Sequence, residues 1–86
     1  MKKEIFAPMP GKIIKILVEK GENIIPEQNL IVLESMKMEN LITSSTPGIV
    51  HDILVKENDF VKSKQLIMVL KQLDSRMRMA PGILVI

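Results

Sequence analysis

Two segments of the chain repeat each other at a fixed offset, and this repeat limits the folds that the sequence can adopt. Residues 10–34 align with residues 47–71 without a gap, at an offset of 37. The alignment also places Gly21 on Asn58. These two residue types tolerate a left-handed backbone best, so both units are expected to turn at the same point. The eight identities are Pro10-Gly11 with Pro47-Gly48, Ile16-Leu17-Val18 with Ile53-Leu54-Val55, Gln28 with Gln65, and Val32-Leu33 with Val69-Leu70.

Each unit predicts a strand, a turn, a short extended piece and a second long strand, because β-branched residues dominate its apolar runs. The chain is 47% hydrophobic but has only two aromatic residues, so Ile, Val, Leu and Met must form the core. Two copies of one unit indicate a single all-β domain, in which two small sheets pack face to face with pseudo-twofold symmetry. The expected strands are residues 4–7, 11–18, 23–25, 30–35, 38–43, 48–55, 60–62 and 66–71, with no helix of consequence.

The first long strand of each unit departs from strict alternation of apolar and polar residues. In the second unit, Val50 and Ile53 are expected to face the core while His51 and Asp52 face solvent. Val50 and Ile53 are three residues apart, whereas side chains on one face of a regular strand are separated by an even number of residues. A β-bulge, which inserts one extra residue into the strand, would let both apolar side chains face the core. We therefore predict β-bulges near residues 51–52 and, by the repeat, near residues 14–15.

The stretch from Glu34 to Asn40 lies between two apolar runs and predicts two strands that meet at a tight turn, with Lys37 at its tip. Such turns prefer Asn, Asp or Gly, because their central residues need positive φ. Met36-Lys37 and Lys37-Met38 both break this preference, and failures of local turn chemistry are frequent at functional sites. Exposed methionines are also typical of contact surfaces. By the repeat, Lys37 corresponds to Asp74, so Lys37 should project away from both chain ends.

The sequence offers little for catalysis. It has no cysteine, which excludes disulfides, zinc-thiolate sites and a cysteine nucleophile. Its one histidine, His51, has no evident triad partner, and we expect an ordinary surface or half-buried residue. The acids Glu34 and Glu39 flank the tip without an indicated cleft, and no metal-binding cluster stands out. The glycines are isolated turn glycines rather than a phosphate loop, namely Gly11, Gly21, Gly48 and Gly82.

Charge and hydropathy exclude further classes of function. The net charge is +2 with both signs interspersed, so the basic, aromatic-rich stripe typical of nucleic-acid binding is missing. No apolar run approaches the roughly 20 residues of a membrane span, and no signal peptide is visible. We therefore expect a cytoplasmic domain over residues 1–73, without direct membrane insertion. Residues 74–86 fall outside the repeat and are expected to form a flexible tail, with an edge strand or a partner contact as the alternative.

The segment Glu34-Ser35-Met36-Lys37-Met38-Glu39 resembles the attachment motif of biotin carboxyl carrier domains, usually Glu-Ala-Met-Lys-Met. The resemblance covers about residues 4–72 and includes Ala7-Pro8-Met9-Pro10-Gly11 and the turn motif of residues 55–61. Ser35 replaces the usual alanine, and Asn58 the usual turn glycine. No inserted "thumb" segment is present, which favours the thumbless carriers of pyruvate, propionyl-CoA and other carboxylases and of sodium-pumping decarboxylases.

The resemblance implies a flattened barrel of two four-stranded antiparallel sheets, with biotin joined to Lys37 on a β-hairpin. A biotin protein ligase would attach the biotin, a biotin carboxylase would carboxylate it, and a carboxyltransferase or decarboxylase would take the carboxyl group. Met36 and Met38 would contact these partners, and Glu34, Ser35 and Glu39 would support the hairpin. The domain would itself catalyse nothing.

Two alternatives belong to other classes. A lipoyl domain shares the fold and carries its cofactor on an equivalent lysine, but its tip usually reads Asp-Lys-Ala. A plain structural or interaction barrel would carry no cofactor at all. Intact mass separates the three, because biotinylated, lipoylated and unmodified chains differ.

Overall fold

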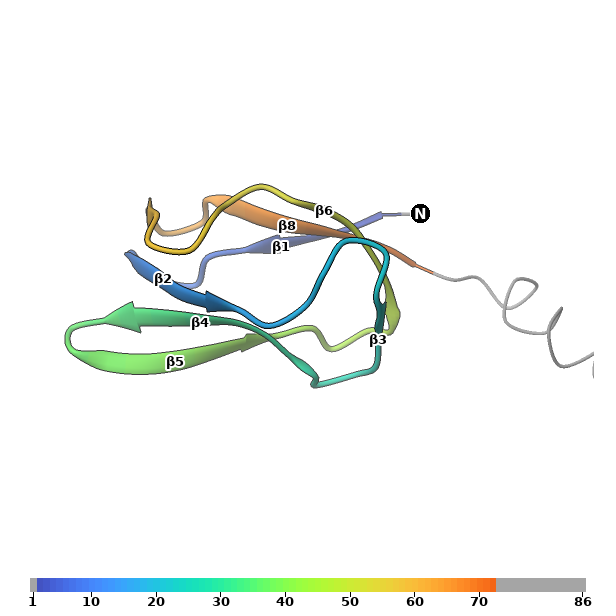
Figure 1. The fold of residues 1–86 in the computed structure, drawn as a ribbon, viewed down its shortest axis with the longest axis horizontal. Coiled ribbons are helices and arrows are strands. Elements are labelled where there is room, and N and C mark those ends of the chain that lie inside the picture. Colours follow the sequence, from blue (N-terminus) through green and yellow to red (C-terminus); the bar gives the residue numbers. More distant parts are fainter. Residues whose placement is uncertain (1, 73–86) are drawn as a thin grey trace, which may run out of the picture.

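Eight strands form two four-stranded antiparallel sheets in the computed structural model, which describes residues 2–72 (Figure 1). The predicted all-β fold is confirmed, and residues 2–72 contain no helix. The predicted tail, residues 74–86, lies outside the described residues. The strands are β1 (Lys2–Phe6), β2 (Gly11–Ile16), β3 (Asn23–Ile24), β4 (Asn29–Ser35), β5 (Met38–Thr43), β6 (Gly48–Ile53), β7 (Phe60–Val61) and β8 (Leu66–Lys71).

The two sheets are related by the repeat. One has the strand order β1-β8-β6-β3 and the other β5-β4-β2-β7. The offset of 37 carries β2, β3 and β4 onto β6, β7 and β8, so each sheet has the same order of equivalent strands. Each unit contributes its short strand to the sheet of the other unit, because β3 pairs with β6 and β7 pairs with β2. This exchange ties the two units into one body.

Both predicted bulges are present at equivalent positions. The register of β2 against β4 shifts between Ile13 and Lys15, and that of β6 against β8 shifts between Val50 and Asp52. Ile13 and Val50 are buried, as the bulged pattern requires. His51 is exposed, which confirms its predicted surface position.

The predicted left-handed turns are also present in both units. Gly21 has φ of 91° and Asn58 has φ of 77°. The Gly21 amide donates to the Val50 carbonyl at 2.8 Å, and the Asn58 amide donates to the Ile13 carbonyl at 2.7 Å. Each turn therefore fastens its own unit to the bulge of the other unit.

The first long strands end two residues earlier than the predicted ranges 11–18 and 48–55, because the chain crosses there from one sheet to the other. Leu17 and Leu54 are half-exposed at this crossing, although their amides still donate to the carbonyls of Leu30 and Ile67 at 2.9 and 3.0 Å. The next residues, Val18 and Val55, turn into the core. The sequence pattern extended the predicted strands to these residues because they are apolar and buried, although they lie outside the strands.

The core lies between the sheets and consists almost entirely of aliphatic residues. Ser44 is also buried, and it is the repeat equivalent of buried Ala7. Its hydroxyl donates to the Thr46 carbonyl at 2.9 Å and accepts from the Thr46 amide at 3.2 Å, so burial leaves it satisfied. The buried hydrophobic residues are Ile5, Ala7, Ile13, Val18, Ile24, Leu30, Ile31, Leu33, Ile42, Val50, Val55, Val61, Ile67, Met68 and Leu70.

The hairpin between β4 and β5 lies at one end of the barrel, and the start of β1 and the end of β8 lie at the other (Figure 1). Lys2 pairs directly with Lys71. The prediction that Lys37 projects away from the N-terminal end is therefore confirmed. Asp74, its expected counterpart, lies outside the described residues.

Candidate functional site

Strands β4 and β5 are joined by a turn of only two residues. Ser35 pairs with Met38, which leaves Met36 and Lys37 as the loop. Their φ angles are 56° and 65°, so both occupy the left-handed region that two-residue hairpin turns require and that normally selects Asn and Gly. Each such non-glycine residue costs roughly 1–2 kcal/mol. The predicted turn is present at the predicted residues, and the backbone strain is held at the lysine itself.

The side chains of this turn are turned outward. Met36 is 92% exposed and Met38 is 67% exposed, and Lys37 is also exposed. The Lys37 amine therefore lies in solvent at the extreme end of a rigid barrel. An amine in this position can be acylated, and a large attached group meets no steric obstacle from the barrel.

The base of the hairpin is held by backbone and amide contacts. Glu34 pairs directly with Glu39 across the two strands, an arrangement of like charges that gives no stability of its own. The Asn40 side-chain amide donates to the carbonyls of Met38 at 3.3 Å and Leu33 at 3.4 Å. Asn40 therefore ties β5 to β4 just below the turn. This role could not be predicted from local patterns, because only the pairing register shows which carbonyls Asn40 can reach.

Gly11 begins β2, beside strand β4 of the hairpin, at a point where no side chain fits. A Cβ atom there would collide with the Glu34 carbonyl oxygen, and at the equivalent Gly48 it would lie 2.8 Å from the Lys71 carbonyl oxygen. The interpretation of both as turn glycines was wrong, since they begin strands β2 and β6. They are glycines because the neighbouring strand passes too close for a methyl group. Gly21 is a turn glycine as predicted, and Gly82 lies outside the described residues.

One row of side chains crosses the outer face of the hairpin's sheet. Cross-strand pairing aligns Glu39 with Glu34, Glu34 with Lys12, and Lys12 with Phe60. The Lys12 ammonium lies 5.9 Å from the centre of the Phe60 ring, within cation–π range. This pair could not be predicted from local patterns, because β2 and β7 are far apart in the chain.

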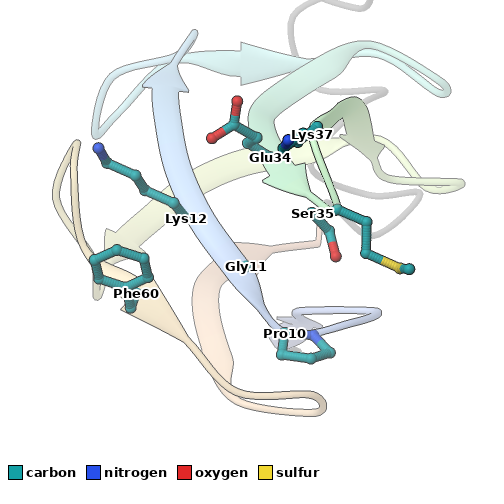
Figure 2. A pocket seen from close by; sticks show the side chains of 8 residues that line it. Pro10, Gly11, Lys12, Glu34, Ser35, Lys37 and Phe60 are labelled. Carbon is teal, nitrogen blue, oxygen red and sulfur yellow. The ribbon is translucent and has the colours of Figure 1, made fainter.

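An open depression of about 510 Å³ connects this row to the tip (Figure 2). In Figure 2 the Lys12 side chain lies on the same side of β2 as Phe60, while Glu34, Ser35 and Lys37 lie on the other side. The depression therefore brings together Lys37, the predicted contact residue Met36 and the predicted supporting residues Glu34 and Ser35, whereas Met38 and Glu39 do not line it. The residues that line the depression are Pro10, Gly11, Lys12, Glu34, Ser35, Met36, Lys37 and Phe60.

No group of three or more His, Cys, Asp or Glu side chains within residues 2–72 is placed to hold a metal ion. Within the same range, no helix is long and apolar enough to cross a bilayer.

The chain is similar to known proteins over most of the barrel. The family model described as "Biotin-requiring enzyme" matches residues 3–70. A biotin carboxyl carrier protein of Streptococcus mutans is 44% identical over 57 residues, which are 66% of this chain and 44% of that protein. The mitochondrial pyruvate carboxylase of Rattus norvegicus is 37% identical over 68 residues, which are 79% of this chain but only 6% of that enzyme.

A solved structure supports the fold. The crystal structure of the Kluyveromyces lactis urea carboxylase matches with a TM-score of 0.77 and 24% identity, over 81% of this chain and 6% of that one. The chain thus spans a small part of the carboxylases that it matches and less than half of the carrier protein. The match to the family model and the level of identity to these relatives show that the chain belongs to the biotin and lipoyl attachment family of biotin-requiring enzymes, as a biotinyl domain.

Proposed function

We propose that Lys37 carries biotin in amide linkage, and that the domain shuttles carboxyl groups between a biotin carboxylase site and a carboxyltransferase or decarboxylase site. The observation that carries the proposal is the position of Lys37, exposed in a strained two-residue turn at the end of the barrel farthest from Lys2 and Lys71. The two-residue turn holds the Lys37 backbone at the tip, and its side chain is exposed to solvent. A partner enzyme can then reach the lysine without disturbing the core.

The geometry fits biotin as the attached group. A ligase must bring the Lys37 amine into its own active site, and only the two loop residues and their exposed neighbours need to enter with it. When bound, biotin supplies a ureido group that can accept and release a carboxyl group. The domain supplies the amine, the rigid support and a surface that partners can recognise.

The residues around Lys37 have separate proposed roles. Met36 and Met38 offer exposed, flexible apolar contacts to the ligase and to the partner active sites. Glu34 and Glu39 place two negative charges at the base of the hairpin. These charges would orient a partner that carries basic groups and raise its rate of association. Ser35 is half-buried and pairs with Met38 to close the turn.

The domain acts as a non-catalytic carrier in this proposal. Its partners are a biotin protein ligase, a biotin carboxylase, and a carboxyltransferase or decarboxylase. The relatives include pyruvate carboxylase and a carrier protein, and the acceptor of the carboxyl group is not specified by residues of this barrel. The cytoplasmic location and the boundary between residues 1–73 and 74–86 stay predictions.

A lipoyl carrier would use the same exposed lysine on the same hairpin. The Met-Lys-Met sequence of the tip and the biotin proteins among the relatives favour biotin. The test is coexpression with a biotin protein ligase, followed by intact mass and peptide mapping. We expect one biotinyl group on Lys37 and none in Lys37→Arg. A chain that stays unmodified, or that gains lipoate instead, would refute the proposal.

Lys64 provides a matched control. It is also an exposed lysine with positive φ, at 68°, but it lies in the connection between β7 and β8 rather than in a two-residue hairpin. Lys64→Arg should leave the extent of biotinylation unchanged. Equal loss in both variants would mean that the ligase does not recognise the hairpin.

A further inference from the structure

Phe60 is an exposed aromatic residue that the fold does not explain. It is 78% exposed on β7, next to the depression that leads to Lys37. It is also one of only two aromatic residues in the chain. The Lys12 ammonium lies 5.9 Å from the centre of its ring.

The pseudo-twofold symmetry provides an internal comparison. In the other sheet, the positions equivalent to Lys12 and Phe60 are Ile49 and Asn23, and they pair in the same register. The same backbone arrangement is therefore built there without either an aromatic ring or a cation. The Lys12–Phe60 pair belongs to the end of the molecule that carries Lys37 and not to the requirements of the barrel.

We propose that the biotinyl group on Lys37 folds back into this depression and rests against Phe60, with Lys12 donating a hydrogen bond to the ureido oxygen. This proposal rests on the proposed biotinylation of Lys37. The depression presents two kinds of chemistry that match the two ends of the bicyclic ring system. Phe60 and Met36 offer apolar surface to the sulfur-containing ring, and the Lys12 ammonium offers N–H donors to the ureido carbonyl.

The arm is long enough to reach. Pairing places Phe60 level with Glu34 and Glu39, three strand spacings or about 14 Å from β5. Lys37 lies two residues beyond Glu39, so its Cα atom is about 15 Å from that of Phe60. The lysine side chain and the acyl chain of biotin together place about eleven bonds between the lysine Cα and the ring. At the reach of an extended chain, about 3.4 Å for every three bonds, this arm spans about 12 Å. The ring system and the Phe60 side chain each extend several ångströms further and close the remaining gap, so the ring can touch Phe60 without movement of the hairpin.

Weak contacts are sufficient because the ligand is tethered. A short flexible linker gives an effective concentration in the millimolar range. Docking with a millimolar dissociation constant would therefore occupy the depression about half of the time. The docked biotin ring would be partly protected from solvent between encounters with partner enzymes, and the weak contacts would still release it readily.

The first test is nuclear magnetic resonance of the apo and biotinylated protein, with intact mass confirming the modification of every sample. We expect the Phe60 ring signals to shift on biotinylation and to show nuclear Overhauser contacts with the biotin ring protons. Signals of Asn23 and Ile49 serve as the symmetric control and should not move. Shifts confined to residues 35–38, without contacts to Phe60, would overturn the proposal.

The second test is the rate of capture by avidin, which must enclose the free ring. Half-occupied docking would slow capture about twofold, because only the undocked fraction reacts. Phe60→Asn and Lys12→Ile install the residues of the other sheet at these positions and should fold normally. We expect faster capture for both, by up to twofold for Phe60→Asn.

Ile25→Asn is the matched control for this rate, since Ile25 is 66% exposed and directly follows β3 in the other sheet. It should capture at the wild-type rate. Equal capture rates for wild type, Phe60→Asn and Lys12→Ile would refute docking while leaving the biotinylation of Lys37 intact. A missing biotinyl mass would refute the proposed function instead, so the two failures are distinguishable.

Discussion

The turn at Met36 and Lys37 should be convertible into a more stable one at the expense of function. Both residues hold positive φ, at 56° and 65°, and each costs about 1 kcal/mol at the lower end of the usual range. Met36→Asn combined with Lys37→Gly installs residues suited to this geometry and removes about 2 kcal/mol of strain. The glycine restores about 0.5–1 kcal/mol of unfolded-state entropy, which offsets part of the gain. Met36 is 92% exposed, so its replacement loses almost no packing. The net expectation is a stabilisation of about 1 kcal/mol.

Thermal unfolding followed by calorimetry measures this change. For a domain of this size, 1 kcal/mol raises Tm by about 4–8 °C. Met38→Asn is the control, because Met38 is also exposed but lies in β5 without positive φ, and its effect should stay within about 0.5 kcal/mol. A double variant with the Tm of the wild type or below would show that the turn stores no strain. The single variant Met36→Asn keeps the lysine, and it should be more stable yet biotinylated more slowly.

Three further predictions concern the barrel, and urea denaturation measures each of them. Gly11→Ala should cost about 3 kcal/mol and Gly48→Ala about 1–2 kcal/mol, because the added methyl group meets a backbone oxygen in both cases but more closely at Gly11; equal costs would contradict this order. Ser44→Ala should cost about 1 kcal/mol through loss of the hydrogen bonds to Thr46, and an unchanged midpoint would mean that those bonds contribute nothing. Gly21→Ala should cost about 1–2 kcal/mol although nothing lies within 4 Å of the added methyl group, because φ is 91° there; a neutral effect would show that the turn relaxes.

The repeat made much of this fold predictable. Local signals at equivalent positions reinforce one another, so a weak pattern in one unit is checked by the other. The bulges at Ile13 and Val50 and the turns at Gly21 and Asn58 were predicted in this way. The position of Lys37 was predictable as well, because a two-residue turn without Asn or Gly is conspicuous between two apolar runs.

Contacts between the units could not be predicted from local patterns. Nothing in residues 23–24 or 60–61 says that each short strand joins the sheet of the other unit, because short strands carry too few residues to show a preferred partner. The pairing of Lys12 with Phe60 depends on that exchange. The close approach at Gly11 likewise depends on how tightly β2 lies against β4, which the alternation of apolar residues does not report.

The pairing of Lys2 with Lys71 has a mechanical consequence. Polypeptide attached at either of these points would hold the barrel by its base, with the Lys37 hairpin at the opposite end of the barrel. A given bend in such a linker would then move the hairpin tip farther than any other part of the barrel, because the tip lies farthest from the attachment point. Most of the travel between two enzymes would come from this pivot, and the cofactor arm would supply only the final approach.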